Sequence, residues 1–199
     1  MALKYQFNKT FQNQLNKELK VRVNALPTLQ AKEAALRAVV KLAREEVERI
    51  ENKLDIAKKA VASAERLFAE FPKGLVTISA VRTSIKKIAG VKTPVLEGVD
   101  FEMRQLPLFS MPAWFPWGIE RLKDLLSLET EREVAVRKQT ALEYARKKTT
   151  QKVNLYEKVQ IPEYRQAILK IKRFLEDEEN LAKSSQKILK EKMLREEAA

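Results

Sequence analysis

Carboxylates are the residues of this chain whose type and spacing could do chemistry. One cluster holds Glu45, Glu46 and Glu48, and a second runs from residue 176 to 179. Two carboxylates can serve as general acid and base when their environments separate their pKa values. Both clusters lie in charged stretches of helical composition, where carboxylates normally pair with Lys or Arg on a solvated helix face. We therefore expect no catalytic residue in either cluster.

The remaining residue composition excludes most other kinds of catalysis. The 199 residues include no histidine and no cysteine, which excludes imidazole acid–base chemistry, thiolate nucleophiles, disulfides and typical zinc sites. Gly74, with Lys86 and Lys87 well downstream, lacks the spacing of a phosphate-binding loop, and no nucleophile elbow, zinc-protease motif or dinucleotide fingerprint occurs. The sequence predicts a protein that is not an enzyme, with no catalytic, cofactor-binding or metal-binding residue.

The charge balance is strongly basic, at +12. Lys and Arg can bind nucleic acid by releasing counterions, and Arg146, Lys147, Lys148 and Lys152 form the clearest basic run. The run is also typical of a solvated helix face, and an acidic protein partner would suit the excess charge equally well. No apolar run has signal-peptide or membrane-spanning length, so we expect a soluble, intracellular protein without direct membrane insertion.

Glycine and proline divide the chain into three parts. All 4 glycines and most of the 7 prolines fall between residues 72 and 118, while Ala, Leu, Lys, Glu and Arg dominate elsewhere. This pattern predicts a helix over 1–71, an irregular insert over 72–118 and a second helix over 119–199.

The first helix carries a long apolar stripe. Apolar residues recur alternately every four and three positions from Leu15 to Phe68, and only Arg22 and Glu33 interrupt them. A period of about 3.5 residues held over many heptads is typical of a left-handed coiled coil. The predicted seam consists of Leu15, Leu19, Leu26, Leu29, Leu36, Val40, Val47, Ile50, Leu54 and Val61.

The second helix has a shorter matching seam. Its predicted members are Ile161, Tyr164, Ile168, Ile171 and Leu175, after which the pattern fades. Before Val153 the stripe is less regular, although Ile119, Leu122, Leu126 and Val136 keep an apolar face. Two long helices joined by an insert most simply fold back on each other. The predicted fold is therefore dominated by α-helix: an antiparallel two-helix coiled coil with a short β-hairpin insert.

The insert contains two different kinds of sequence. β-branched runs at 76–81 and 91–99, bounded by glycine and proline, predict short strands that could form a hairpin, with Pro94 confining its strand to an edge. Downstream, an apolar segment either covers the open end of the coil, docks another protein, or does both. Its candidate docking residues are Leu108, Phe109, Met111, Trp114, Phe115 and Trp117.

Three stretches carry a resemblance to a known family. Residues 147–179, with Val153, Asn154, Ile161 and Pro162, resemble the C-terminal helix of the D subunit of V/A-type (archaeal/vacuolar-type) ATPases. Residues 8–37 resemble the opening helix of that family, and residues 86–102 its central segment, in the same order. The aromatic segment 106–118 is longer and more aromatic than is typical of the family.

This resemblance implies a function and a set of partners. The family's members form the central rotor stalk of a rotary ATPase or ATP synthase, and couple ATP hydrolysis or synthesis to proton or sodium translocation without performing the chemistry. The implied partners are the ring of catalytic and regulatory (A and B) subunits, the F subunit of the stalk, and the adaptor on the membrane ring. The implied location is cytoplasmic and peripheral to the membrane, with no nucleic acid bound.

Two prolines occur within the predicted helices. With Leu26 and Ile161 at seam positions, Pro27 and Pro162 both point out of the seam. If the helices pair according to their extents, Pro162 lies opposite Glu33 and close in height to Pro27. Two prolines and two polar seam residues at one level predict a local bend or altered twist.

Two other functions are compatible with a basic coiled coil. A prefoldin-like chaperone or scaffold also places β-hairpins between antiparallel helices, but it assembles in several copies. A nucleic-acid-binding coiled coil would show affinity that falls with salt.

Overall fold

The computed structural model of the chain describes residues 6–62, 64–68, 70–72, 74–104 and 112–197. Its elements, in chain order, are α1 (Lys9–Ala62), α2 (Glu65–Phe68), β1 (Val76–Ile88), β2 (Val91–Met103), α3 (Phe115–Asn154), the π-helix η2 (Leu155–Gln160) and α4 (Ile161–Glu197). Long helical segments flank a two-stranded antiparallel hairpin, so the predicted fold class is confirmed. The chain forms two compact units: a terminal unit of residues 1–31 and 149–199, and a central unit of residues 32–148.

In the terminal unit the start of α1 runs antiparallel to α4. Asn8 caps α1, because its side-chain Oδ1 accepts a hydrogen bond from the N–H of Phe11 at 2.7 Å. The core cluster joins one residue of α1 to one face of α4, and consists of Leu15, Tyr164, Ala167 and Ile171, with Phe11, Leu19, Ile168 and Leu175 packed around it. This is the seam that the apolar period predicts, seen from both helices.

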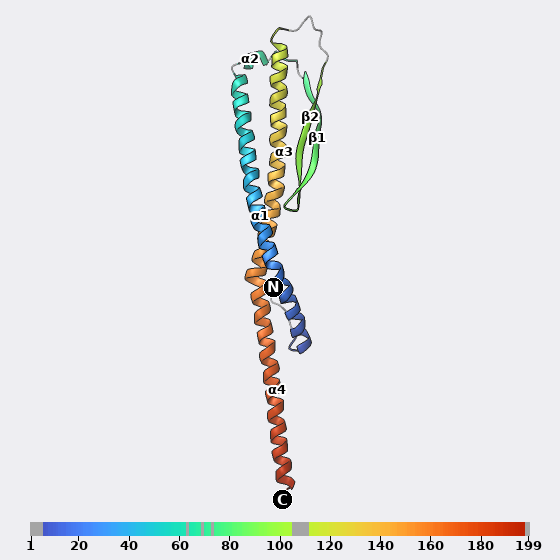
Figure 1. Ribbon diagram of the computed structural model, residues 1–199, viewed down its shortest axis with the longest axis vertical. Helices are drawn as coiled ribbons and strands as arrows, with labels where there is room; N and C mark the ends of the chain where they lie inside the picture. Colours follow the sequence, from blue (N-terminus) through green and yellow to red (C-terminus); the bar gives the residue numbers. More distant parts are fainter. Residues whose placement is uncertain (1–5, 63, 69, 73, 105–111, 198–199) are drawn as a thin grey trace. The chain divides into compact units, whose positions relative to one another are not determined.

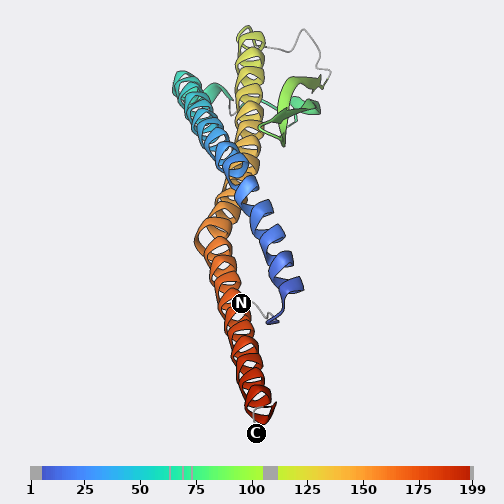
Figure 2. The ribbon, with the colours of Figure 1, turned by 60° about the horizontal axis from the view of Figure 1, so that its bottom comes forward.

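In the central unit the hairpin lies along a second antiparallel helix pair, formed by α1 and α3 (Figure 1). Figure 2 shows the same arrangement from another direction. Leu36 and Leu142 are completely buried between the two helices, and Ala89 and Val91 from the hairpin tip pack against their cluster. Three layers therefore meet at this core.

The hairpin closes through a tight turn. Ile88 pairs with Val91, which leaves Ala89 and Gly90 as the two turn residues, with φ of 49° and 80°. Positive φ at both central positions is the type I′ geometry that matches the twist of antiparallel strands. Each strand has 13 residues and is therefore longer than the short strands predicted, and Pro94 lies in a two-stranded sheet where every strand is an edge.

The helix boundaries differ from the predicted ones on both sides of the insert. α1 ends at Ala62, not at residue 71, and the N–H of Ala64 bonds the carbonyl of Val61 at 2.8 Å, a three-residue step that tightens the chain. On the other side of the insert, α3 begins at Phe115, before residue 119. Pro116 fits this first turn because its missing N–H has no partner there in any helix.

The altered twist predicted near Pro162 is found in the C-terminal segment. The six residues of η2 immediately precede Ile161, whose N–H bonds the carbonyl of Tyr156, five residues back. This wide turn moves the carbonyls that a proline ring would otherwise crowd. The N-terminal segment behaves differently, because α1 continues without interruption through Pro27. Both prolines are exposed, as expected of positions outside the seam.

The pairing level assumed for Pro162 was wrong. Gln160 bonds Arg22, and Tyr164 bonds Glu18, so Pro162 lies level with residues between Glu18 and Arg22, not with Glu33. The sequence reveals which residues face inward, but a repeat of similar apolar residues leaves the offset between two helices open.

Candidate functional site

The carboxylate clusters lie on charged helix faces. Glu46 accepts a bond from Lys138 at 2.7 Å, and Glu45 lies 3.9 Å from Lys41. In the second cluster the hydrogen bond from Lys183 to Glu179, at 2.8 Å, lowers the pKa of that carboxyl. Among the described residues, no group of three or more acidic side chains could hold a metal ion. The geometry of both clusters provides ion pairing along and between helices.

The predicted seam residues are each buried or half-buried in the structure. In the terminal unit Leu15, Ile161, Tyr164 and Ile171 are buried, and Leu19, Leu26, Leu29, Ile168 and Leu175 are half-buried. In the central unit Leu36, Val40, Val47, Ile50 and Leu54 are buried, and Val61 is half-buried.

The inward face of α3 was not fully anticipated. It contains Thr130, Val134, Ala135 and Leu142, whereas Val136 is exposed. The hydroxyl of Thr130 donates to the carbonyl of Leu126 at 2.7 Å, so a polar residue can be buried there without an unpaired group. A search for apolar residues alone overlooks such a face.

Ion pairs join the helices of the central unit. Arg44 bonds Glu143 through two guanidinium nitrogens, at 2.8 and 2.6 Å. Hydrogen bonds from Arg44 and Gln139 lower the pKa of Glu143. Arg132 reaches Glu51 at 3.1 Å, and this bond raises the pKa of the guanidinium. One face of α1 thus pairs with α3 at two levels, two helical turns apart.

A polar cluster interrupts the seam of the terminal unit at Arg22, one of the two seam positions that the sequence marks as polar. Its Nε donates to Oε1 of Gln160 at 2.9 Å, and its guanidinium carbon lies 4.4 Å from the centre of the Tyr164 ring. The Tyr164 hydroxyl donates to Oε2 of Glu18 at 2.6 Å. Gln160 and Glu18 were not identified from the sequence, although Gln160 lies four residues from both Tyr156 and Tyr164.

An aromatic cluster closes one end of the central unit. Phe71 is its centre, with ring centroids 4.8 Å from both Trp114 and Phe115. Phe115 is buried and Trp114 half-buried, so these two candidate docking residues cover the end of the helix pair. Trp117 is exposed and lies 6.1 Å from Phe68. The other three candidates, Leu108, Phe109 and Met111, lie outside the described residues.

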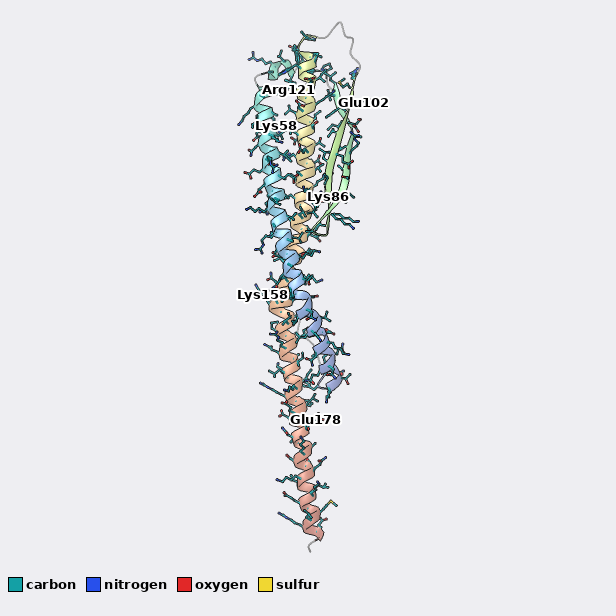
Figure 3. All side chains as sticks on the ribbon, viewed as in Figure 1. Lys58, Lys86, Glu102, Arg121, Lys158 and Glu178 are labelled. Atoms are coloured by element: carbon teal, nitrogen blue, oxygen red, sulfur yellow. The ribbon has the colours of Figure 1, made fainter. Side chains whose placement is uncertain are left out.

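A shallow groove lies near the same end, between α1 and α3. Ala57 and Ala60 are small and leave a space of about 400 Å³, whose opposite wall includes Leu125 and Leu128. Lys58 on α1 and Arg121 on α3 mark this end in Figure 3.

The last part of α4 carries apolar residues that no described element covers. Figure 3 shows Glu178 on α4 beyond the first turn of α1. Beyond this point the stripe is exposed, and consists of Leu181, Ile188, Leu189, Met193 and Leu194. A stripe at helical spacing is typical of a surface that contacts another protein.

The lysines of the basic run are exposed, and two of them lie near tyrosine rings. Lys148 lies 5.6 Å from the ring centre of Tyr144, and Lys152 lies 5.8 Å from that of Tyr156. Arg146 is half-buried, and its Nε has no hydrogen-bond partner within the described residues. No described helix is long and apolar enough to cross a membrane.

The comparisons with known proteins agree on one family. The model of the family described as the ATP synthase D subunit matches residues 12–191. A protein named as the D subunit of V-type ATP synthase, from Borreliella burgdorferi, is 32% identical over 189 residues, which cover 89% of each chain. Proteins of the same name from Chlamydia abortus and Chlamydia pneumoniae are each 30% identical, over 157 and 163 residues. These alignments cover 76% of this chain, and 76% and 75% of the respective relatives.

Proposed function

This chain belongs to the family of ATP synthase D subunits, and on that premise we propose that it is the central axle of a V-type rotary ATP synthase. As such it is one component of the complex and performs no catalysis itself. It couples ATP hydrolysis or synthesis in a ring of catalytic and regulatory subunits to the translocation of protons or sodium ions.

The observation that carries the proposal is the extent of the family match. Residues 12–191 include both helical arms and the hairpin, not one helix that any coiled coil could imitate. The seams and the interhelix ion pairs support a mechanical role, because torque requires two helices that stay paired under load. Glu45, Glu46 and Glu179 of the two carboxylate clusters form ion pairs, which agrees with a component that leaves catalysis to its partners.

Exposed apolar surfaces support the proposed partners. The uncovered stripe of α4 suits contact with the surrounding A and B subunits. Trp117 and the groove beside Ala57 and Ala60 suit the membrane-ring adaptor, and the hairpin and the side of the helix pair suit the F subunit of the stalk. The axle then lies on the cytoplasmic side, peripheral to the membrane.

The excess of positive charge supports mobile contact with the ring. Lys17, Lys20 and Lys187 are exposed, and exposed charges attract acidic residues only weakly in salt. Such contacts hold an axle without fixing one angle. Replacing all three with Gln should alter assembly or torque, and unchanged assembly and torque would contradict this part of the proposal.

Native mass spectrometry tests the proposal directly. The chain is co-expressed with the catalytic, regulatory and F-type stalk subunits, and we expect one copy bound to a ring of alternating subunits. Association into a multi-copy coil that ignores the ring would overturn the proposal in favour of a chaperone or scaffold. Salt-sensitive binding to DNA or RNA, with no ring binding, would favour the nucleic-acid function.

A variant pair then locates the contact with the ring. Ile188→Lys and Leu189→Lys change exposed residues of the α4 stripe, so the isolated chain should keep its helical content. In the complex both should weaken ring binding and reduce ATP hydrolysis. Ser184→Lys adds the same charge at an exposed site without removing apolar surface, and should have a smaller effect.

A further inference from the structure

The apolar seam of the terminal unit does not define its own register well. Leu15 and Leu19 pack in one cluster with Ala167, Ile168 and Ile171 of α4, and Leu19 and Leu26 are one heptad apart. After a slide of one heptad, Leu19 and Leu26 would exchange levels, and Arg22 would move to or from the level of Leu15. Apolar contacts discriminate weakly between such alternatives, because burial depends on area and not on identity.

The polar cluster distinguishes between these registers. Arg22 is only 21% exposed at its side chain, yet its donors have partners on both helices: Gln160 across the seam, and the Glu18 carbonyl at 3.0 Å and carboxylate at 3.2 Å on its own helix. After a slide of one heptad, Arg22 would face the apolar cluster around Ala167 or, in the other direction, Val153 at the end of α3. The first alternative keeps the Glu18 acceptors but removes the Gln160 acceptor from the partly buried Nε and places the charge among apolar residues, which is unfavourable.

Tyr164 provides a second, independent link. It is 7% exposed and belongs to the core, while its hydroxyl bonds Glu18 across the seam at 2.6 Å. The same ring stacks under the Arg22 guanidinium. Two links one turn apart fix both the offset of the helices along the axis and their rotation.

We propose that Glu18, Arg22, Gln160 and Tyr164 form a register lock, with Arg22 as its positioning residue. The four residues determine which of several apolar pairings the helices of the terminal unit adopt. A single polar seam residue can specify register in a coiled coil, at some cost in stability. Gln160 is the last residue of η2, so the wide turn beside Pro162 ends at the point where the lock closes.

Spin-label distances measure the register directly. The natural chain has no cysteine, so cysteines placed at the exposed positions Asn13 and Arg173 would be the only labelling sites. We expect one narrow distance distribution for the full-length chain. Arg22→Leu with Gln160→Leu should give a broad or multiple distribution, because each heptad of sliding moves the two labels about 10 Å relative to each other along the helix axis, at 1.5 Å per residue. Its thermal midpoint should be unchanged or higher, which loss of a merely stabilising contact would not produce.

Matched controls separate the lock from general effects. Lys17→Leu with Gln166→Leu makes the same kind of change at exposed sites on the same helices, and should keep the narrow distribution. A single unchanged distance in the Arg22→Leu, Gln160→Leu variant would overturn the proposal.

An exchange variant covers the case in which the leucine variant loses its helical structure. Arg22→Gln with Gln160→Arg keeps one donor and one acceptor at the same level and should retain one narrow distance. A broad distribution from a folded exchange variant would overturn the lock. Because these measurements use the free chain, their outcome is independent of the proposed function.

Discussion

The two units hold their helices together by different means. The central unit uses ion pairs between helices, such as Arg44 to Glu143, and adds the hairpin as a third layer over Leu36 and Leu142. In the described part of the terminal unit the start of α1 packs against α4 without a third layer, and the seam combines an apolar cluster with the polar cluster around Arg22. When a buried side chain is removed, three packed layers cannot easily move together to fill the cavity. Two helices can approach each other and fill it. The same substitution should therefore have different consequences in the two units.

The largest expected effect is the loss of a buried side chain in the central unit. Leu142 and Ile171 are both completely buried, one in each unit. Leu142→Ala should cost about 3 to 5 kcal/mol, because the hairpin tip prevents the helices from closing the cavity, and Ile171→Ala about 2 to 3 kcal/mol. Hydrogen exchange at amides of each unit, with denaturant unfolding, measures both. Leu42→Ala, at an exposed site of α1, should change stability by less than about 0.5 kcal/mol.

Equal losses of stability from Leu142→Ala and Ile171→Ala would remove this distinction between the two units. They would mean that the hairpin tip does not restrain the helix pair beneath it, despite the packing of Ala89 and Val91 on that cluster.

The aromatic end of the central unit should tolerate no added volume. A β-carbon at Gly118 would lie 2.7 Å from the Phe71 ring and 3.0 Å from that of Trp114. Gly118→Ala should therefore destabilise by about 1 to 3 kcal/mol, although alanine favours the helix by about 1 kcal/mol. Fluorescence of Trp114 and Trp117, with thermal unfolding, reports the change. Adding Phe71→Leu removes the obstructing ring and should recover part of the loss, and absence of any recovery would argue against steric crowding.

The sequence allowed the fold to be predicted where a regular period operates. The stripe from Leu15 to Val61 and the shorter one from Ile161 to Leu175 face inward because heptad spacing follows from helix geometry. The same reasoning overlooked the inward face of α3. Thr130 can be buried there because its hydroxyl bonds a carbonyl of its own helix, and Ala135 can be buried because it is small.

Local backbone geometry and pairing could be predicted only in part. Two prolines were treated alike, yet α1 continues through Pro27 and the wide turn forms only before Pro162. To predict the polar cluster, one must know which residue of the other helix faces Arg22. That depends on the helix register, which the apolar period leaves open. Gln160 and Glu18 could have been sought as polar residues near Tyr164, but only after that register was known.

The hairpin turn offers a test in which one substitution has opposite effects at two sites. Ala89 has φ of 49°, a conformation that costs an L-residue roughly 1 to 2 kcal/mol and glycine almost nothing. Ala89→Gly should stabilise the central unit by up to about 1 kcal/mol, less the loss of its methyl group from the Leu36 cluster. Ala80→Gly, within β1, should destabilise by about 0.5 to 1 kcal/mol. Thermal midpoints measure both, and a fall for Ala89→Gly would show that packing outweighs strain.

The smallest effect concerns the polar cluster of the terminal unit and depends on pH. The hydrogen bond from Tyr164 is the main cause that lowers the pKa of Glu18 from its ordinary value of 4.5, while burial raises the pKa of Tyr164 above 10. A lowered carboxyl pKa contributes stability above pH 4.5 that is lost as pH falls through the folded pKa. A raised phenol pKa contributes stability below pH 10 that is lost as pH rises through the folded pKa. Tyr164→Phe should therefore cost about 0.5 to 1 kcal/mol at about pH 7, and the difference from the natural chain should shrink below about pH 4.5.

Denaturant unfolding between about pH 3 and pH 8 checks this expectation. Tyr144→Phe removes the same hydroxyl from a tyrosine that is 64% exposed on α3, and should change stability at no pH in this range. If the cost of Tyr164→Phe is constant across the range, then the hydroxyl bonds neutral and ionised Glu18 equally well. The terminal unit would then depend on the geometry of its polar cluster and not on its charge. The two units would then still differ in their response to pH, because in the central unit the bond between Arg44 and Glu143 requires the carboxylate to be ionised.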